Sequence, residues 1–291
     1  MSIDDDALTV LTHASRHLFL SPHYDDIPLS TGATARLLAD RGLTPETLVV
    51  FGSEPDRGQQ LSAFAQGLHQ VWGLTADQAI ASRYAEETAA AAILGATTRV
   101  LPFRDAIYRG HVYLSDDDLF GVPATAEASL PTEIVESLEL GESPAVGTRI
   151  YAPLAVGKHV DHQLVHQAAM DLASSGWDVW FYEDIPYALK PHALETRLAE
   201  IREPTGIRIE PVASIPVEAV WDRKIDAILS YPSQLETVFR QYVGVGTSRW
   251  EISEALMNYA VSAGNGAVAE RFRRLSQECP LRGVDEPLRL R

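Results

Sequence analysis

The chain has 291 residues, of which 46% are hydrophobic and 22% are charged, and this composition excludes disordered, collagen-like and low-complexity proteins. Its 24 basic and 40 acidic residues give a formal net charge of −16 at pH 7. This acidic excess argues against a partner such as nucleic acid or an anionic membrane, because phosphate-rich surfaces attract basic proteins.

The cysteine count and the N-terminus indicate the cellular compartment. The single cysteine, Cys279, excludes an internal disulfide and a metal site built from cysteines. The first ten residues are acidic and lack the apolar segment of a signal peptide. The longest run of small apolar residues, 89–94, is too short to span a membrane. We therefore expect a soluble, cytoplasmic protein.

Short apolar runs alternate with helical stretches along the chain, in the pattern typical of an α/β protein. The predicted strands are residues 17–21, 47–52, 98–103, 149–154 and 177–182. The predicted helices are residues 31–41, 77–94, 160–174 and 251–261. Ser30 or Thr31 is the expected cap of the first helix. This alternation predicts an α/β fold, in which a mostly parallel, Rossmann-like sheet is covered by helices on both faces.

No repeat and no linker divides the sequence, so we expect a single domain over residues 1–291. Residues 104–130 have little periodicity and contain three consecutive aspartates, which predicts an irregular loop excursion. This excursion is either a tolerated surface insertion or a functional segment such as a mobile lid. The tail over residues 278–291 is expected to be loosely packed.

A first cluster of polar residues follows the first predicted strand and contains His23, Asp25 and Asp26. Ligand sites in open α/β sheets lie at the carboxyl ends of strands. Imidazole and carboxylate groups in one turn suit zinc or a similar divalent cation. Because adjacent residues point in different directions, one aspartate can bind the metal while the other faces a metal-bound water. The alternative is an aspartate that caps the helix beside a surface histidine.

A second cluster follows the fourth predicted strand and contains His159, Asp161 and His162. The spacing of the two histidines lets both face one cleft, and Asp161 can accept a hydrogen bond from an imidazole and fix its tautomer. His166 lies one helical turn further, and we expect it to be no ligand because the HExxH pattern is absent. Two histidines and one carboxylate, with an open fourth position, are the composition of a catalytic zinc site.

The Pro-His-x-Asp-Asp motif at 22–26 and the His-x-Asp-His motif at 159–162 together resemble the PIG-L/LmbE-like deacetylases. These are zinc-dependent enzymes that remove acetyl groups from N-acetylated sugars and sugar conjugates. Weaker similarities extend from about residue 17 to about residue 235, including the segments 181–187 and 231–234. The sequence departs from the family at Ile27, where an acidic residue is usual.

The resemblance implies a ligand set and a general base. His23, Asp26 and His162 would bind one Zn²⁺, and Asp25 would activate a zinc-bound water. The implied substrate is a small N-acylated amino sugar or its conjugate, from which the enzyme would remove an acyl group, in the usual case acetyl.

The resemblance also implies roles for residues around the metal. His159 would stabilise the oxyanion in its protonated form or act as the general acid, and Asp161 would orient a histidine. Arg83 and Asp105 would contact the substrate. A tyrosine that some relatives carry is missing near Lys158, which itself is either a substrate contact or a solvated lysine.

Several alternatives stay open. Glu183 and Asp184, at the end of the fifth predicted strand, either reach the cleft or form a local turn network. Residues 264–269 match GxGxxA but follow a predicted helix rather than a strand, which argues against a dinucleotide site. The same metal site would also suit hydrolysis of another amide or of a phosphoester. A non-catalytic Rossmann-like binding protein is the third hypothesis, and a homo-oligomer is compatible with the sequence.

Overall fold

The computed structural model describes residues 9–56, 58–110, 112–141 and 143–276. Its described strands form one sheet in the order β3-β2-β1-β4-β5-β7-β6. The first five strands in this order run parallel, and β7 runs antiparallel to both of its neighbours. The predicted α/β fold with a mostly parallel sheet is confirmed. The strands are β1 Arg16–Ser21, β2 Glu46–Val49, β3 Thr97–Val100, β4 Thr148–Pro153, β5 Asp178–Tyr182, β6 Ile209–Pro216 and β7 Ala269–Leu275.

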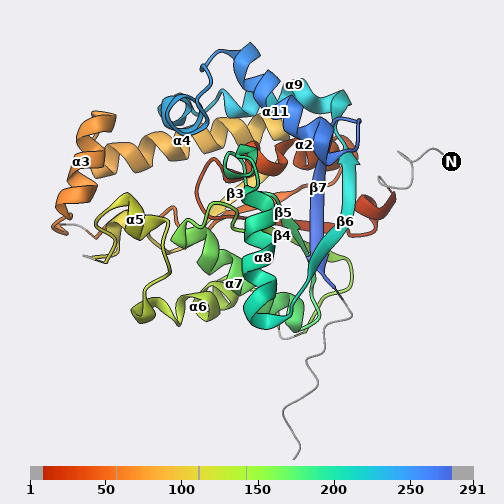
Figure 1. The fold of residues 1–291 in the computed structure, drawn as a ribbon, viewed down its shortest axis with the longest axis horizontal. Helices are drawn as coiled ribbons and strands as arrows, with labels where there is room; N and C mark the ends of the chain where they lie inside the picture. The colour runs from red at the N-terminus through yellow and green to blue at the C-terminus, as the bar shows by residue number, and fades with distance from the viewer. Residues whose placement is uncertain (1–8, 57, 111, 142, 277–291) are drawn as a thin grey trace, which may run out of the picture.

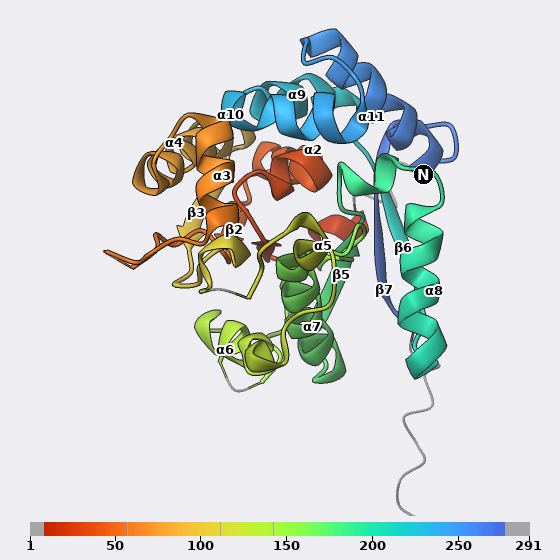
Figure 2. The same cartoon turned by 60° about the vertical axis from the view of Figure 1, so that its left-hand side comes forward.

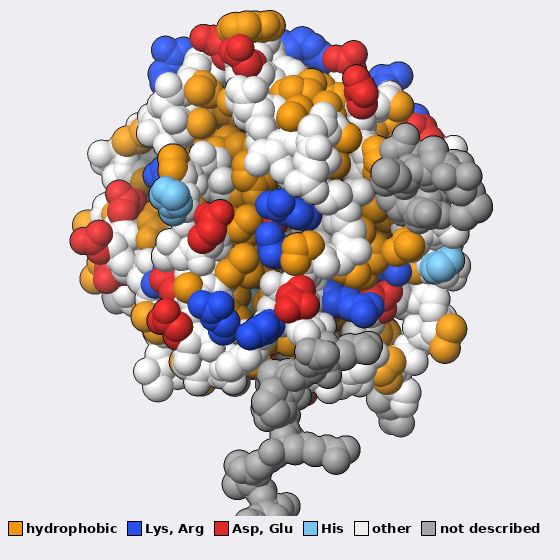
Figure 3. All heavy atoms as spheres, turned by 45° about the vertical axis from the view of Figure 1, so that its right-hand side comes forward, with side chains coloured by type: hydrophobic (Ala, Val, Ile, Leu, Met, Phe, Trp, Pro, Cys, Tyr) orange, Lys and Arg blue, Asp and Glu red, His pale blue; other side chains and the backbone are white. Residues whose placement is uncertain are grey.

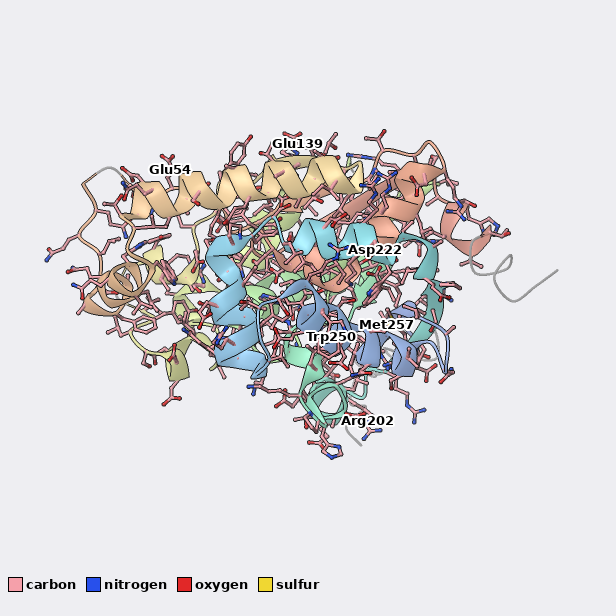
Figure 4. The ribbon with its side chains drawn as sticks, turned by 90° about the horizontal axis from the view of Figure 1, so that it is seen from above. Glu54, Glu139, Arg202, Asp222, Trp250 and Met257 are labelled. Atoms are coloured by element: carbon pink, nitrogen blue, oxygen red, sulfur yellow. The ribbon has the colours of Figure 1, made fainter. Side chains whose placement is uncertain are left out.

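Helices cover the sheet on both faces, as Figures 1 and 2 show. One layer contains α2 Asp26–Asp40, α4 Ala76–Leu94, α9 Trp221–Ile228 and α11 Arg249–Ala263. The opposite layer contains α6 Leu130–Ser137 and α7 Val160–Ser174. Figure 4 looks down on the first layer, with Asp222 on α9 and with Trp250 and Met257 on α11. Further helices are α3 Ala63–Trp72, α5 Asp116–Leu119, α8 Ala193–Thr205 and α10 Pro232–Leu235, followed by the π-helix η5 Glu236–Val243.

The start of α2 differs from the prediction. The helix begins at Asp26, so Ser30 and Thr31 lie within it and neither caps it. Thr31 has non-helical dihedral angles (φ −142°, ψ 20°), and α2 kinks there. Two backbone N–H groups just after the kink donate to the carboxylate of Glu270 on β7, at 3.1 and 2.7 Å. Lys224 contacts the same carboxylate at 2.7 Å and balances its charge. The sequence pattern therefore located the second half of a kinked helix.

The C-terminal part of the sheet was not predicted. β6 contains prolines at both 211 and 216 and a register shift between Pro211 and Ala213, which hides the alternation of a regular strand. The GxGxxA match at 264–269 lies in the connection from α11 to β7, so it does not follow a strand. Figure 3 shows the face that carries this region, where Lys and Arg side chains lie among acidic and apolar ones.

The core lies on both sides of the central strands. Trp180 of β5 packs against Tyr151 of β4 and Phe272 of β7, with ring centroids 6.0 and 5.6 Å away. Trp180 is 1% exposed, so it is a core residue rather than a platform for a sugar. Among the described helices, none is both long and apolar enough to cross a bilayer.

Candidate metal centre

The two polar clusters meet at one edge of the sheet. His23 and Asp25 lie in the turn from β1 to α2, and Asp26 begins α2. His159 is the N-cap of α7, and Asp161 and His162 lie in the first turn of that helix. Because β1 and β4 are adjacent and parallel, both turns leave the sheet at the same edge. The His23 ring lies 4.9 Å from that of His159 and 5.3 Å from that of His162, measured between centroids.

Three side chains from these turns form a donor set for a metal ion. Ligand atoms of His23, Asp26 and His162 lie within 4.8 Å of one another. The Nε2 atom of His162 is buried without a hydrogen-bond partner, 3.4 Å from Oδ1 of Asp26. The Nδ1 atom of His23 lies 3.6 Å from Oδ2 of the same aspartate. A buried unpaired nitrogen is costly unless a ligand uses it, so this set fits one zinc ion with an open position.

A second set, His23 with His159 and Asp161, also lies within 4.8 Å. Both carboxylate oxygens of Asp161, however, already contact protein groups. Its Oδ1 atom is 2.7 Å from the guanidinium of Arg109, and its Oδ2 atom accepts hydrogen bonds from His23 Nε2 and the Ala106 N–H, both at 3.0 Å. Burial would raise the pKa of Asp161, but Arg109 and the His23 hydrogen bond hold it well below its ordinary value. The donor set with His162 is therefore the better metal site.

Each histidine of the preferred set is oriented by a buried carboxylate. Asp161 bonds Nε2 of His23, and Asp184 lies 2.7 Å from Nδ1 of His162. These contacts leave Nδ1 of His23 and Nε2 of His162 facing Asp26, the side on which a metal would bind. Carboxylates that fix the tautomer of a metal-binding histidine are a general feature of zinc sites.

Glu183 and Asp184, left undecided by the sequence, have different surroundings. Asp184 reaches the metal centre through His162. Glu183 instead bonds Arg271 at 2.7 and 2.9 Å and Arg273 at 2.7 Å, and so ties β5 to β7. Both residues lie just after β5, which ends at Tyr182, so the periodicity of the strand gives no sequence signal that distinguishes them.

The electrostatics of the site favour a cation. Burial lowers the pKa of His23, but the hydrogen bond that its ring donates to Asp161 and the charges of Asp105 and Asp26 raise the pKa to about 9. The carboxylates thus attract a positive charge to this point, which a divalent metal ion would supply.

His159 has the opposite tendency. Burial, followed by the charge of His23, lowers its pKa well below 6.5, so His159 is neutral rather than protonated. Its Nδ1 atom accepts a hydrogen bond from the Asp161 N–H at 3.2 Å. The single ring proton therefore lies on Nε2, and the neutral ring can still donate one hydrogen bond.

Asp25, Arg83 and Asp105 line the cleft beside the metal centre. Asp25 is outside both donor sets and receives a hydrogen bond from the guanidinium of Arg83 at 2.9 Å. Arg83, expected to contact substrate, therefore also holds Asp25 in place. Asp105 approaches His23 Nε2 at 3.8 Å and accepts a hydrogen bond from the Ile107 N–H.

His166 on α7 and Lys158 just before α7 lie away from the reacting centre. His166 is buried and bonds the Pro153 carbonyl at 2.9 Å, and it belongs to neither donor set. Lys158 pairs with Glu200 at 3.2 Å and does not line the cleft, which leaves no support for it as a substrate contact.

An open cleft of about 420 Å³ leads to the metal centre. Its inner end is polar and holds His23, Asp25 and Asp105. Its other walls come from α2, α3, the excursion, the segment around Tyr187 and η5, and they are mainly apolar. The apolar and aromatic wall residues are Leu29, Leu68, Trp72, Ile107, Leu119, Phe120, Tyr187, Val238 and Tyr242.

Comparisons with known proteins agree with this geometry. The PIG-L family model, described as GlcNAc-PI de-N-acetylase, matches residues 18–173. The 2'-N-acetylparomamine deacetylase of Niallia circulans is 34% identical over 58% of this chain and 66% of its own length. The enzyme of the same name from Streptomyces fradiae is 31% identical over 76% of this chain and 74% of its own length.

Solved structures point to the same family. The zinc-inhibited form of a teicoplanin deacetylase matches with a TM-score of 0.71 and 25% identity, over 93% of this chain and 100% of that one. The A40926 pseudoaglycone deacetylase matches with a TM-score of 0.69 and 26% identity, over 90% of this chain and 98% of that one. The chain therefore belongs to the PIG-L family of zinc-dependent N-deacetylases.

Proposed function

We propose that this enzyme removes the acetyl group from an N-acetylated amino sugar carried in a larger conjugate, with Asp25 as the general base. The observation that supports the proposal is the different position of the two adjacent aspartates that follow β1. Asp26 belongs to the metal donor set, whereas its neighbour Asp25 lies outside that set and lines the cleft. A carboxylate placed beside a metal but not bound to it is available for proton transfer.

The chemistry follows from these positions. A bound Zn²⁺, held by His23, Asp26 and His162, supplies a Lewis acid that acidifies water and polarises the amide carbonyl. Asp25 accepts a proton from the attacking water. The Nε2–H group of His159 donates a hydrogen bond to the oxygen that gains negative charge.

The same carboxyl group completes the reaction. A neutral His159 has no proton to give without losing its hydrogen bond to the oxyanion, so we assign protonation of the leaving amine to Asp25. Arg83 keeps the Asp25 carboxylate directed into the cleft through its 2.9 Å hydrogen bond. Asp105, at the inner end of the cleft, is placed to accept a hydrogen bond from a sugar hydroxyl.

The size and lining of the cleft support a conjugate rather than a single sugar. Cavities of about 300 to 1,000 Å³ accommodate ligands of drug size, and the cleft measures about 420 Å³. Its walls include Trp72, Phe120 and Tyr242, whose rings can pack on a second sugar or on an aglycone. The named relatives are a 2'-N-acetylparomamine deacetylase and an A40926 pseudoaglycone deacetylase.

A substrate panel tests the proposal. Purified protein is loaded with zinc and incubated with N-acetylglucosamine, an N-acetylated aminoglycoside and an N-acetylglucosaminyl glycopeptide, and released acetate is measured. We expect kcat/KM to be higher for at least one conjugate than for the free sugar. Acetate release from none of the three would contradict the proposal, and phosphate release from a phosphoester control would replace it with the alternative hydrolase.

A further inference from the structure

Arg109 of the irregular excursion contacts a buried carboxylate of the metal centre. Its guanidinium lies 2.7 Å from Asp161 Oδ1, and the Ala106 N–H of the same excursion donates to Asp161 Oδ2 at 3.0 Å. Asp161 is 0% exposed, and its Oδ2 atom also bonds His23. Two of the three groups that surround this buried carboxylate therefore come from the excursion, and the third is a proposed metal ligand.

Arg109 also holds the far end of the excursion. Its Nε and Nη2 atoms donate to Glu127 at 2.7 and 3.2 Å, and Tyr113 donates to the same carboxylate at 2.6 Å. The guanidinium also contacts the rings of Phe51 and Tyr113, 4.8 and 5.4 Å from their centroids. These contacts form a continuous buried chain from Glu127 through Arg109 and Asp161 to the metal centre.

The segment held by this chain builds part of the substrate cleft. Asp105 and Ile107 lie just before Arg109, and Leu119 and Phe120 lie between Arg109 and Glu127. All four line the cleft. The position of a wall of the cleft therefore depends on the same contacts that orient His23.

We propose that Arg109 is a positioning residue that couples the order of residues 104–127 to metal binding. By holding Asp161, Arg109 orients the His23 ring, and by holding Glu127 it fixes the cleft wall. Coupling of this kind is reciprocal, so a metal that fixes His23 also orders the excursion, and an ordered excursion strengthens metal binding. The inference rests on the proposed function, since it takes His23 as a metal ligand.

The test measures zinc affinity and amide hydrogen exchange of full-length protein, with and without zinc. In the wild type, zinc should slow exchange over residues 104–127. Arg109→Met should weaken zinc binding about 10- to 100-fold, the range found for partners of metal ligands. At saturating zinc, this variant should also lose the zinc-dependent slowing. Arg109→Lys keeps the charge beside Asp161 and should recover most of the zinc affinity.

Arg104 provides the matched control, because it belongs to the same excursion but pairs with the exposed Asp56. Arg104→Met should behave as wild type in both measurements. If Arg109→Met does not fold, Glu127→Gln replaces it. This change keeps Arg109 on Asp161 but loosens the far end, so it should reduce the zinc-dependent slowing and weaken zinc binding, by less than Arg109→Met does.

Two results would overturn the coupling. The first is a folded Arg109→Met protein that binds zinc with wild-type affinity. The second is hydrogen exchange over residues 104–127 that zinc does not slow in the wild type, or that zinc slows equally in Glu127→Gln and in the wild type. Either result, obtained with a wild-type enzyme that binds zinc and releases acetate, leaves the proposed function intact. A wild-type protein that binds no zinc would instead remove the basis of both proposals.

Discussion

The two turns at the metal centre each supply a histidine and an aspartate, but they are held in different ways. The β1–α2 turn is held locally, since the His23 N–H donates to Asp26 Oδ2 at 2.7 Å. The β4–α7 turn depends on distant residues, because Asp161 contacts Arg109 and His162 contacts Asp184. Both turns therefore supply metal-binding and cleft-lining groups, but the buried carboxylates that orient the two histidines, Asp161 and Asp184, come from the second turn and from the end of β5.

This comparison predicts which property each substitution changes. Changes to Asp25 or His159, which line the cleft but lie outside the preferred donor set, should lower kcat and leave zinc bound. Changes to the buried carboxylates that support the histidines should weaken zinc binding and leave kcat of the zinc-saturated enzyme nearly intact.

The largest effect on rate is expected for Asp25→Asn. An amide cannot accept the proton, so kcat should fall about 10²- to 10⁴-fold, the contribution typical of a general base. Zinc content, measured by elemental analysis, should stay at the wild-type level because Asp25 is outside the donor set. Loss of zinc together with activity would mean that Asp25 is itself a metal ligand, and would contradict the different roles assigned to Asp25 and Asp26.

A somewhat smaller effect is expected for His159→Ala. Removing one hydrogen-bond donor to an oxyanion lowers kcat about 10²- to 10³-fold. Lys158→Ala is the matched control in the same turn, because Lys158 pairs with Glu200 at the surface, and its kcat should stay within about twofold of wild type. Equal losses in the two variants would mean that the turn as a whole, rather than the His159 ring, is responsible.

The most direct test of the supporting contacts compares two neighbouring acids. Asp184→Asn should weaken zinc binding about 10- to 100-fold, because His162 loses the carboxylate that orients it. Glu183→Gln should leave zinc affinity unchanged and lower the melting temperature, because Glu183 joins β5 to Arg271 and Arg273. Zinc titration and thermal unfolding of both variants distinguish the two roles. Weaker zinc binding in Glu183→Gln, with unchanged zinc binding in Asp184→Asn, would contradict them.

The sequence was most informative where groups that act together are also close along the chain. The helix predicted over 160–174 matches α7, because its apolar residues repeat with the helical period and its start is marked by the second motif. The residues proposed as zinc ligands lie in two short motifs, and adjacent parallel strands bring the motifs together.

Long-range contacts were beyond the sequence pattern. Asp184 is 22 residues from His162 in the sequence. Arg109, which contacts Asp161, lies in a segment without helical or strand periodicity, so the sequence pattern did not place it. The N–H groups just after the kink in α2 donate to Glu270, which lies 236 or 237 residues away in the sequence. These residues become neighbours only when the sheet folds, so no pattern of residues close together in the sequence predicts the contacts.

The measurement that tests the central claim most directly is the metal content of the purified wild type and of His162→Ala, with acetate release measured in parallel. We expect about one zinc ion per chain in the wild type, because the site offers three protein ligands. His162→Ala should lose both the zinc and the activity. A wild type that stays metal-free after reconstitution with zinc, or a His162→Ala protein that keeps its zinc and its rate, would contradict the account.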